Sequence, residues 1–191
     1  MNITVYLGAG SGTPALQKAA RDLGLWIGRT GSTLVYGGSR TGLMGELAFG
    51  ALDAGGRVVG VEPAMFMEKE LQLDAIQELI VTEDFAQRKA KMIQLGDAFI
   101  AFPGGTGTLE EISEIMSALS LGLMDSPCIL YDLNGYYTGL KVLLEQMIEA
   151  GLSTKERQKK IYFAEDLAQI AEILGLPAPG SLPAVDTCHC L

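Results

Sequence analysis

Residues 98–111 read AFIAFPGGTGTLEE, and this stretch decides the class of fold. Ala98–Phe102 is a continuous apolar run, which is typical of a strand that is covered on both faces of its sheet. The glycine-rich turn Gly104–Thr108 follows it, and the helical pattern Leu109–Leu121 begins directly after the turn. A buried strand, a tight turn and a helix form the unit from which parallel α/β sheets are built.

Similar units repeat along the chain. The other predicted strands are Ile3–Leu7, Thr33–Tyr36, Val58–Val61, Glu78–Val81, Cys128–Tyr131 and a short run at Ile161–Phe163. The other predicted helices are Pro14–Arg29, Leu43–Ala54, Tyr137–Ala150 and Asp166–Leu174. We therefore predict an α/β protein with a Rossmann-like, doubly wound parallel sheet. It forms a single domain over residues 1–176, and a loose tail follows over residues 177–191.

The composition fits this interpretation. Of the 191 residues, 48% are hydrophobic and 19% are charged, which excludes a disordered chain. The formal net charge of −9 disfavours a nucleic-acid partner, and no apolar run approaches the roughly 18 residues of a membrane span. Three cysteines cannot build a disulfide framework, so we expect a cytoplasmic protein. Cys188, His189 and Cys190 supply only three ligands, and we expect no metal.

Three glycine-rich turns directly follow predicted strands, at Gly8–Gly12, Gly37–Gly42 and Gly104–Thr108. Ligands of such sheets bind at the carboxyl ends of the strands, and the free N–H groups of a helix N-terminus attract anions. The three turns together therefore predict a phosphate site.

Two common nucleotide motifs do not fit these turns. Thr13 stands where G-x-G-x-x-G requires a third glycine, and no acidic residue closes the second strand, which disfavours NAD. A P-loop requires Gly-Lys-Ser/Thr, but Leu43 follows Gly42 and Thr108 follows Gly107. We expect no cofactor.

The segment Pro103–Glu111 fits the pattern P-G-G-x-G-T-x-x-E, and in this it resembles the LOG-type phosphoribohydrolases. Two further motifs support the resemblance, namely Tyr36-Gly37-Gly38 leading to Gly42-Leu43-Met44-Gly45, and Arg88-Lys89-Ala90. It spans about residues 3–150. The chain departs from the family pattern at Ser39, where a third glycine is usual, and at Leu7 and Ala9, where Cys and Ser are frequent.

The resemblance implies an enzyme that hydrolyses the N-glycosidic bond of nucleoside 5′-monophosphates and releases the free base and ribose 5-phosphate. The implied substrate is AMP or an N6-modified AMP such as cytokinin riboside 5′-monophosphate. It also implies a homodimer, catalytic roles for Arg88 and Glu111, and a substrate contact at Glu70. We expect further substrate contacts from Gly8, Gly37, Gly38, Lys89, Gly104, Gly105, Thr106, Gly107, Thr108 and Glu110. Some members carry a lysine-decarboxylase label, which fits poorly because no residue stands out as a Schiff-base lysine.

The helical spacing of the residues also favours Arg88 and Glu111 as site residues. On a helical wheel the stripe Leu109, Ile112, Met116 and Leu119 places Glu111 at its boundary and Glu110 and Glu114 on the far side. Without the signature, Glu111 reads as an ordinary stabiliser of the helix dipole. In the preceding helix Phe85, Arg88, Met92 and Leu95 share one face, so the Arg88 guanidinium requires an anionic partner. A structural ion pair is the plain alternative for Arg88.

In the implied reaction Glu111 stabilises the positive charge that develops on the ribose, holds the ribose hydroxyls or activates water. Arg88 cannot act as an acid, so it positions either the phosphate or Glu111. A competing hypothesis is a non-catalytic nucleotide or molybdenum-cofactor carrier of the same fold.

Overall fold

The computed structural model describes residues 1–69 and 72–182, in which seven parallel strands form one sheet. The strands are β1 (Asn2–Tyr6), β2 (Thr33–Tyr36), β3 (Arg57–Pro63), β4 (Glu78–Thr82), β5 (Ala98–Ala101), β6 (Cys128–Tyr131) and β7 (Ile161–Ala164). The helices are α1 (Pro14–Arg29), α2 (Gly42–Asp53), α3 (Phe85–Leu95), α4 (Thr106–Ser120), α5 (Thr138–Glu149) and α6 (Leu167–Leu174). Short 3-10 turns occur at η1 (Ala64–Lys69), η2 (Leu133–Gly135) and η3 (Pro179–Ser181). The predicted α/β class is confirmed.

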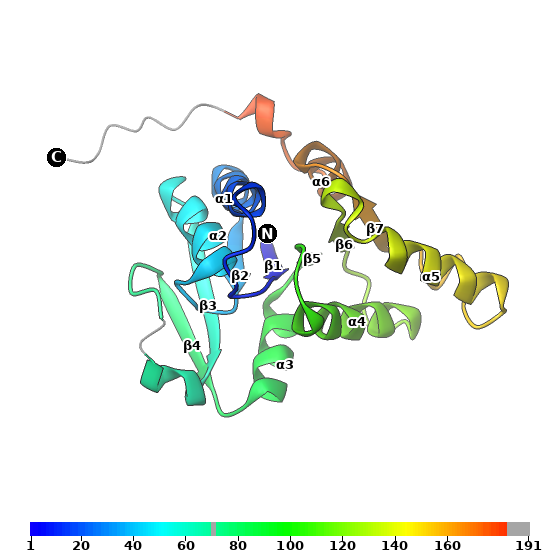
Figure 1. The fold of residues 1–191 in the computed structure, drawn as a ribbon, viewed down its shortest axis with the longest axis horizontal. Coiled ribbons are helices and arrows are strands. Elements are labelled where there is room, and N and C mark those ends of the chain that lie inside the picture. Colours follow the sequence, from blue (N-terminus) through cyan, green and yellow to red (C-terminus); the bar gives the residue numbers. More distant parts are fainter. Residues whose placement is uncertain (70–71, 183–191) are drawn as a thin grey trace.

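Helices cover both faces of the sheet (Figure 1). Alternate residues of one strand point to opposite faces, so Ile3 and Val5 of β1 pack in one apolar cluster and Tyr6 packs in the other. The first cluster includes residues of α1, α2 and α6, and the second includes residues of α3 and α4 with Leu140 of α5. This arrangement is the predicted doubly wound sheet.

The order of the strands locates the site. It is β4-β3-β2-β1-β5-β6-β7, so the chain first moves outward from β1 and then returns to the other side of β1 at β5. The carboxyl ends of β1 and β5 therefore border a topological switch point, where open α/β sheets bind their ligands. Because β2, β1 and β5 are neighbours, the three glycine-rich turns that follow them meet at this edge.

Helix α4 corrects two expectations. It begins at Thr106 rather than at Leu109, because Gly105 is already the N-cap and the following residues form the first helical turn. The expected apolar stripe is wrong at Leu109, which is 43% exposed. The buried face consists instead of Thr108, Glu111, Ile112, Ile115 and Leu119. Glu111 therefore lies on the buried face and not at its boundary.

Helices α1 and α2 pack backbone against backbone. A Cβ atom at Gly24 of α1 would lie 2.0 Å from the carbonyl oxygen of Leu47, and one at Gly50 of α2 would lie 2.2 Å from that of Arg21. Neither position has room for a side chain, so these glycines permit the close approach of the two helices.

The last described residues pack against α1 and the apolar core. The indole Nε1 of Trp26 donates a hydrogen bond to the Pro177 carbonyl at 2.9 Å, and Leu182 packs against the core. The domain boundary at residue 176 stays a prediction, and Cys188, His189 and Cys190 lie outside the described residues. Within residues 1–69 and 72–182, the helices are too short or too polar to cross a membrane.

Candidate active site

A cavity of about 810 Å³ opens at the carboxyl ends of the strands. Its wall comes from the turns after β1 and β2, the end of β3 with η1, and the N-terminal turns of α3 and α4. Ten of the residues expected at the site from the sequence line this cavity: Gly8, Gly37, Arg88, Lys89, Gly105, Thr106, Gly107, Thr108, Glu110 and Glu111. A single cavity thus collects residues from four separate parts of the chain.

The N-terminus of α4 forms one end of the wall. Gly105 is the N-cap and has no side chain to cap the helix, while Leu109 is the first residue whose N–H bonds back to the Gly105 carbonyl. The N–H groups at Thr106, Gly107 and Thr108 therefore precede the helical hydrogen-bond ladder. Such groups and the helix dipole favour an anion, so this turn is suited to hold a phosphate.

Two tyrosines support the strand-to-helix connection. The hydroxyl of Tyr136 donates to the Gly104 carbonyl at 2.5 Å, and that of Tyr137 donates to the Phe102 carbonyl at 2.8 Å. A Cβ atom at Gly104 would lie 2.3 Å from Oγ1 of the buried Thr108. Gly104 itself lies outside the cavity lining, so its place in this structure is to permit the turn.

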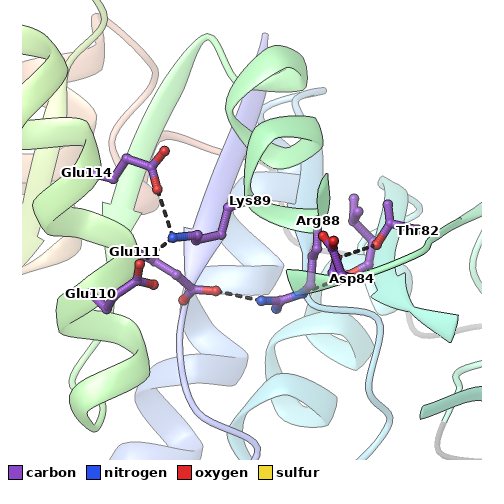
Figure 2. Close-up of polar contacts among 8 residues, drawn as sticks. Thr82, Asp84, Arg88, Lys89, Glu110, Glu111 and Glu114 are labelled. Atoms are coloured by element: carbon purple, nitrogen blue, oxygen red, sulfur yellow. Dashed lines mark hydrogen bonds and ion pairs between the residues drawn. The ribbon is translucent and has the colours of Figure 1, made fainter. Parts of the chain in front are cut away.

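A buried ion pair in the cavity lining joins α3 to α4 (Figure 2). Nη1 of Arg88 donates to Oε1 of Glu111 at 2.6 Å, and Nε of Arg88 donates to the Val61 carbonyl at 3.0 Å. Both charged residues are 8% exposed. A Cβ atom at Gly37 would lie 2.5 Å from Nη2 of Arg88, so this glycine leaves the space that the guanidinium occupies.

The environment of Glu111 raises its pKa. Burial raises the pKa of Glu111, while the Arg88 charge and hydrogen bond oppose the rise without cancelling it. No described residue donates to the second carboxylate oxygen, and the side chain lines the cavity. Glu111 is thus a positioned carboxylate with one oxygen that can act on a ligand.

A second cluster lies beside this pair on the same two helices. Nζ of Lys89 contacts Glu110 and lies 3.0 Å from Oε2 of Glu114 (Figure 2). The hydrogen bonds to Glu110 and Glu114 raise the pKa of Lys89. The side chains of these glutamates are 57% and 47% exposed, so this cluster is largely hydrated.

The wall contains residues that the sequence analysis did not select. Glu62 at the end of β3 is 2% exposed, and Phe66 of η1 packs edge to face against Phe85 of α3, with ring centroids 5.6 Å apart. A carboxylate inside the apolar strand sequence RVVGVEP is a signal that could have pointed to Glu62. Of the expected contacts, Gly38 lies behind Glu62 outside the lining, and Glu70 lies outside the described residues.

Two buried tyrosine hydroxyl groups lie near the carboxylates of the cavity. Those of Tyr6 and Tyr36 have no hydrogen-bond partner among the described residues. Burial raises the pKa of both phenols, and the neighbouring charges of Glu111 at Tyr6 and of Glu62 at Tyr36 add to the rise. Both phenols therefore remain neutral beside Glu111 and Glu62.

Solved structures share this fold. The molybdenum cofactor binding protein of Rippkaea orientalis is 26% identical with a TM-score of 0.68, and the match covers 91% of this chain and 94% of that one. The molybdenum cofactor carrier protein of Chlamydomonas reinhardtii has a TM-score of 0.67 at 24% identity, covering 91% and 98% of the two chains. At this identity the second comparison supports the fold alone.

Sequence comparisons are more specific. A family model described as possible lysine decarboxylase matches residues 44–174. Cytokinin riboside 5′-monophosphate phosphoribohydrolase of Rhodococcoides fascians is 44% identical over 87% of this chain and 85% of its own length. The Arabidopsis thaliana enzyme of that name, LOG4, is 40% identical over 82% of this chain and 74% of its own length. The chain therefore belongs to the LOG family, whose model carries the lysine-decarboxylase description.

Proposed function

We propose that this protein is a phosphoribohydrolase that cleaves the N-glycosidic bond of nucleoside 5′-monophosphates. Water supplies the hydroxyl group at C1′ of the ribose and a proton to the departing base, so the products are ribose 5-phosphate and the free base. We propose AMP and N6-modified AMP, including cytokinin riboside 5′-monophosphate, as the substrate class. The names of the enzymes similar to this chain support this class.

One observation carries the proposal, namely the buried Arg88–Glu111 pair beside the free N–H groups of α4. Hydrolysis at C1′ passes through a cation-like transition state, which a nearby carboxylate stabilises more than it stabilises the neutral ground state. Glu111 is held by Arg88 through one oxygen, and the other oxygen is available to the ribose or to the attacking water. The α4 N-terminus would bind the phosphate and so fix the sugar next to Glu111.

Arg88 acts as a positioning residue in this mechanism. Its guanidinium does not lose its proton in proteins, so it cannot protonate the base. It bonds at the same time to the Val61 carbonyl and to Glu111, which fixes the direction of the carboxylate. Lys89, Glu110 and the turn at Gly8 would complete the binding surface around the phosphate and ribose.

The chemistry of the cavity does not favour a lysine decarboxylase. A Schiff-base lysine must reach its neutral form, for which enzymes lower its pKa. Lys89 is the lysine that lines the cavity within the described residues, and its contacts with Glu110 and Glu114 raise its pKa. A nucleotide or molybdenum-cofactor carrier is also less well supported, because the relatives at 35–44% identity are named as enzymes.

The assembly and setting remain part of the proposal. We propose a homodimer in the cytoplasm that acts in cytokinin biosynthesis, without a nucleic-acid partner. Exposed apolar side chains support association, among them Leu109 at 43%, Leu121 at 69% and Leu123 at 76% exposure. Light scattering that gives the mass of one chain at micromolar concentration would refute the dimer.

Incubation with AMP, followed by chromatographic separation of adenine, tests the activity. We expect adenine and ribose 5-phosphate in equal amounts, and far slower release from adenosine, which has no phosphate to orient the sugar. Equal rates on AMP and adenosine would contradict the phosphate site. Tight binding of monophosphates with no turnover would favour the carrier.

A further inference from the structure

Glu62 is a buried carboxylate in the cavity wall that the proposed mechanism does not use. Its Oε2 accepts a hydrogen bond from Nε2 of Gln72 at 2.9 Å, and the same Nε2 group also donates to the Phe66 carbonyl at 3.1 Å. Among the side chains that the structure describes, those of residues 1–66 and 72–182, no lysine or arginine pairs with Glu62, and none donates to its Oε1. The side chain is therefore buried with one neutral donor only.

Such a carboxylate needs a further hydrogen-bond donor. Removing a charged group from water is costly unless hydrogen bonds or opposite charges replace the lost hydration. Gln72 satisfies one oxygen, and the other oxygen belongs to a group that lines the cavity. A ligand with an N–H group would supply the missing donor.

The order of the strands places Glu62 away from the N-terminus of α4. The α4 N-terminus follows β5, whereas Glu62 lies at the end of β3, and the order β5-β1-β2-β3 separates them by three strand spacings, about 14 Å. The Arg88 guanidinium lies between these ends, over Gly37 after β2. A phosphate on α4 and a ribose at Glu111 thus leave the β3 end of the cavity for the base.

Aromatic side chains line the same end. Phe66 and Phe85 both line the cavity and pack edge to face against each other. Aromatic rings provide an apolar surface on which the flat face of a base can pack, while they offer nothing to a phosphate. The β3 end therefore combines an apolar wall with a single carboxylate acceptor.

We propose that Glu62 is a specificity-determining residue that accepts a hydrogen bond from the amino group of the base. Resting on the proposed function, this inference narrows the substrates to 5′-monophosphates whose base carries an exocyclic amino N–H at the position of N6 of adenine. An N6-alkylated adenine with one remaining N–H group is still accepted. A carbonyl at this position, as in hypoxanthine, would place two acceptors against each other.

The test compares kcat/KM for AMP, for purine riboside 5′-monophosphate and for IMP. Purine riboside 5′-monophosphate lacks the amino group, and IMP has a carbonyl in its place. We expect the wild-type protein to favour AMP over each analogue by about 10- to 100-fold, since purine riboside 5′-monophosphate brings no amino donor to Glu62 and IMP sets a carbonyl oxygen against it. N6-methyl-AMP should resemble AMP, and N6,N6-dimethyl-AMP should resemble the analogues.

Glu62→Gln provides the matched variant. Gln72 would hold the new carbonyl oxygen and turn the new amide NH₂ toward the base, so the preference for AMP over IMP should fall at least about tenfold. Glu83→Gln removes an exposed carboxylate outside the cavity and should leave the ratio unchanged. Unfolding temperatures of both variants show whether they fold.

Two outcomes separate this inference from the proposed function. Equal turnover of AMP and IMP, unchanged in Glu62→Gln, would overturn the role of Glu62 and leave the hydrolysis intact. Absence of turnover on every monophosphate would overturn the hydrolysis. In that case, calorimetric titration with AMP and IMP tests whether Glu62 recognises the base. Equal affinities would overturn this role of Glu62. A preference for AMP that Glu62→Gln removes would support it.

Discussion

Arg88 and Lys89 are neighbours on α3, and each contacts glutamates of α4, but their surroundings differ. The Arg88 and Glu111 side chains are 9% and 10% exposed, whereas those of Lys89, Glu110 and Glu114 are 22%, 57% and 47% exposed. The same two helices thus carry one buried ion pair and one hydrated cluster. Removing one partner of a buried pair typically costs several kcal/mol, while exposed pairs contribute about 0–1 kcal/mol. Burial, and not the number of charges, indicates where the chemistry lies.

Arg88→Ala should have the largest effect, because it leaves Glu111 buried without its cation. We expect a loss of about 3–5 kcal/mol in the free energy of unfolding, together with a severe loss of turnover. Denaturant unfolding and AMP hydrolysis measure the two effects. Arg88→Lys keeps a charge but lacks the fork that reaches both Val61 and Glu111, so it should fold better and still turn over slowly. Wild-type stability in Arg88→Ala would show that the pair is not coupled to the fold.

Glu111→Gln should lower kcat by about 100- to 1,000-fold with little change in KM. The amide keeps the shape of the side chain and loses the charge that stabilises the transition state. Steady-state kinetics on AMP measure the two constants. Glu110→Gln is the comparison from the adjacent position, where the carboxylate is exposed and proposed only to help bind the substrate, so its loss of kcat should be smaller. A larger loss of kcat in Glu110→Gln than in Glu111→Gln would place the catalytic carboxylate in the exposed cluster.

The pH dependence should report on the buried pair. Because burial raises the pKa of Glu111, the acidic limb of kcat/KM should lie above the ordinary glutamate value of 4.5. Activity requires the ionised form, so it falls as the pH drops through the raised pKa. In Arg88→Ala the opposing guanidinium is absent, and the limb should move to higher pH. Profiles from about pH 4 to 8 check this, and a limb that moves to lower pH would contradict the assigned partner.

Glu114→Gln should have the smallest effect. It removes one of two exposed partners of Lys89, and such contacts contribute less than about 1 kcal/mol and are screened by salt. We expect turnover within about twofold of the wild-type protein and an almost unchanged unfolding temperature. A large loss of activity would mean that the cluster holds the substrate more directly than its exposure indicates.

Periodicity predicted much of the fold because it reflects local geometry. The predicted segments Pro14–Arg29, Thr33–Tyr36 and Cys128–Tyr131 coincide with α1, β2 and β6. The predicted start of α4 was wrong because Thr106 and Gly107 have weak helix propensity, whereas the helix begins directly after its N-cap, Gly105. The predicted burial of Leu109 was wrong because a hydrophobic side chain can remain on the surface. Hydrophobicity alone therefore does not identify the buried face of a helix.

The candidate site, too, was partly predictable from the sequence. The sequence by itself determined a parallel α/β sheet, glycine-rich turns at its carboxyl edge, an arginine on an apolar helix face, and a Glu111 that lies closer to the apolar stripe than Glu110 and Glu114. These features follow from the 3.6-residue repeat of the helices, from the continuous apolar runs of strands buried on both faces, and from the backbone freedom of glycine.

Only the tertiary structure decided that Arg88 meets Glu111, that Gly37 makes room for the guanidinium, and that Glu62 enters the same cavity. The contacting residues are far apart in the sequence, and the order of the strands brings them together. Burial of a charge depends on every element packed around it, and no local pattern contains that information.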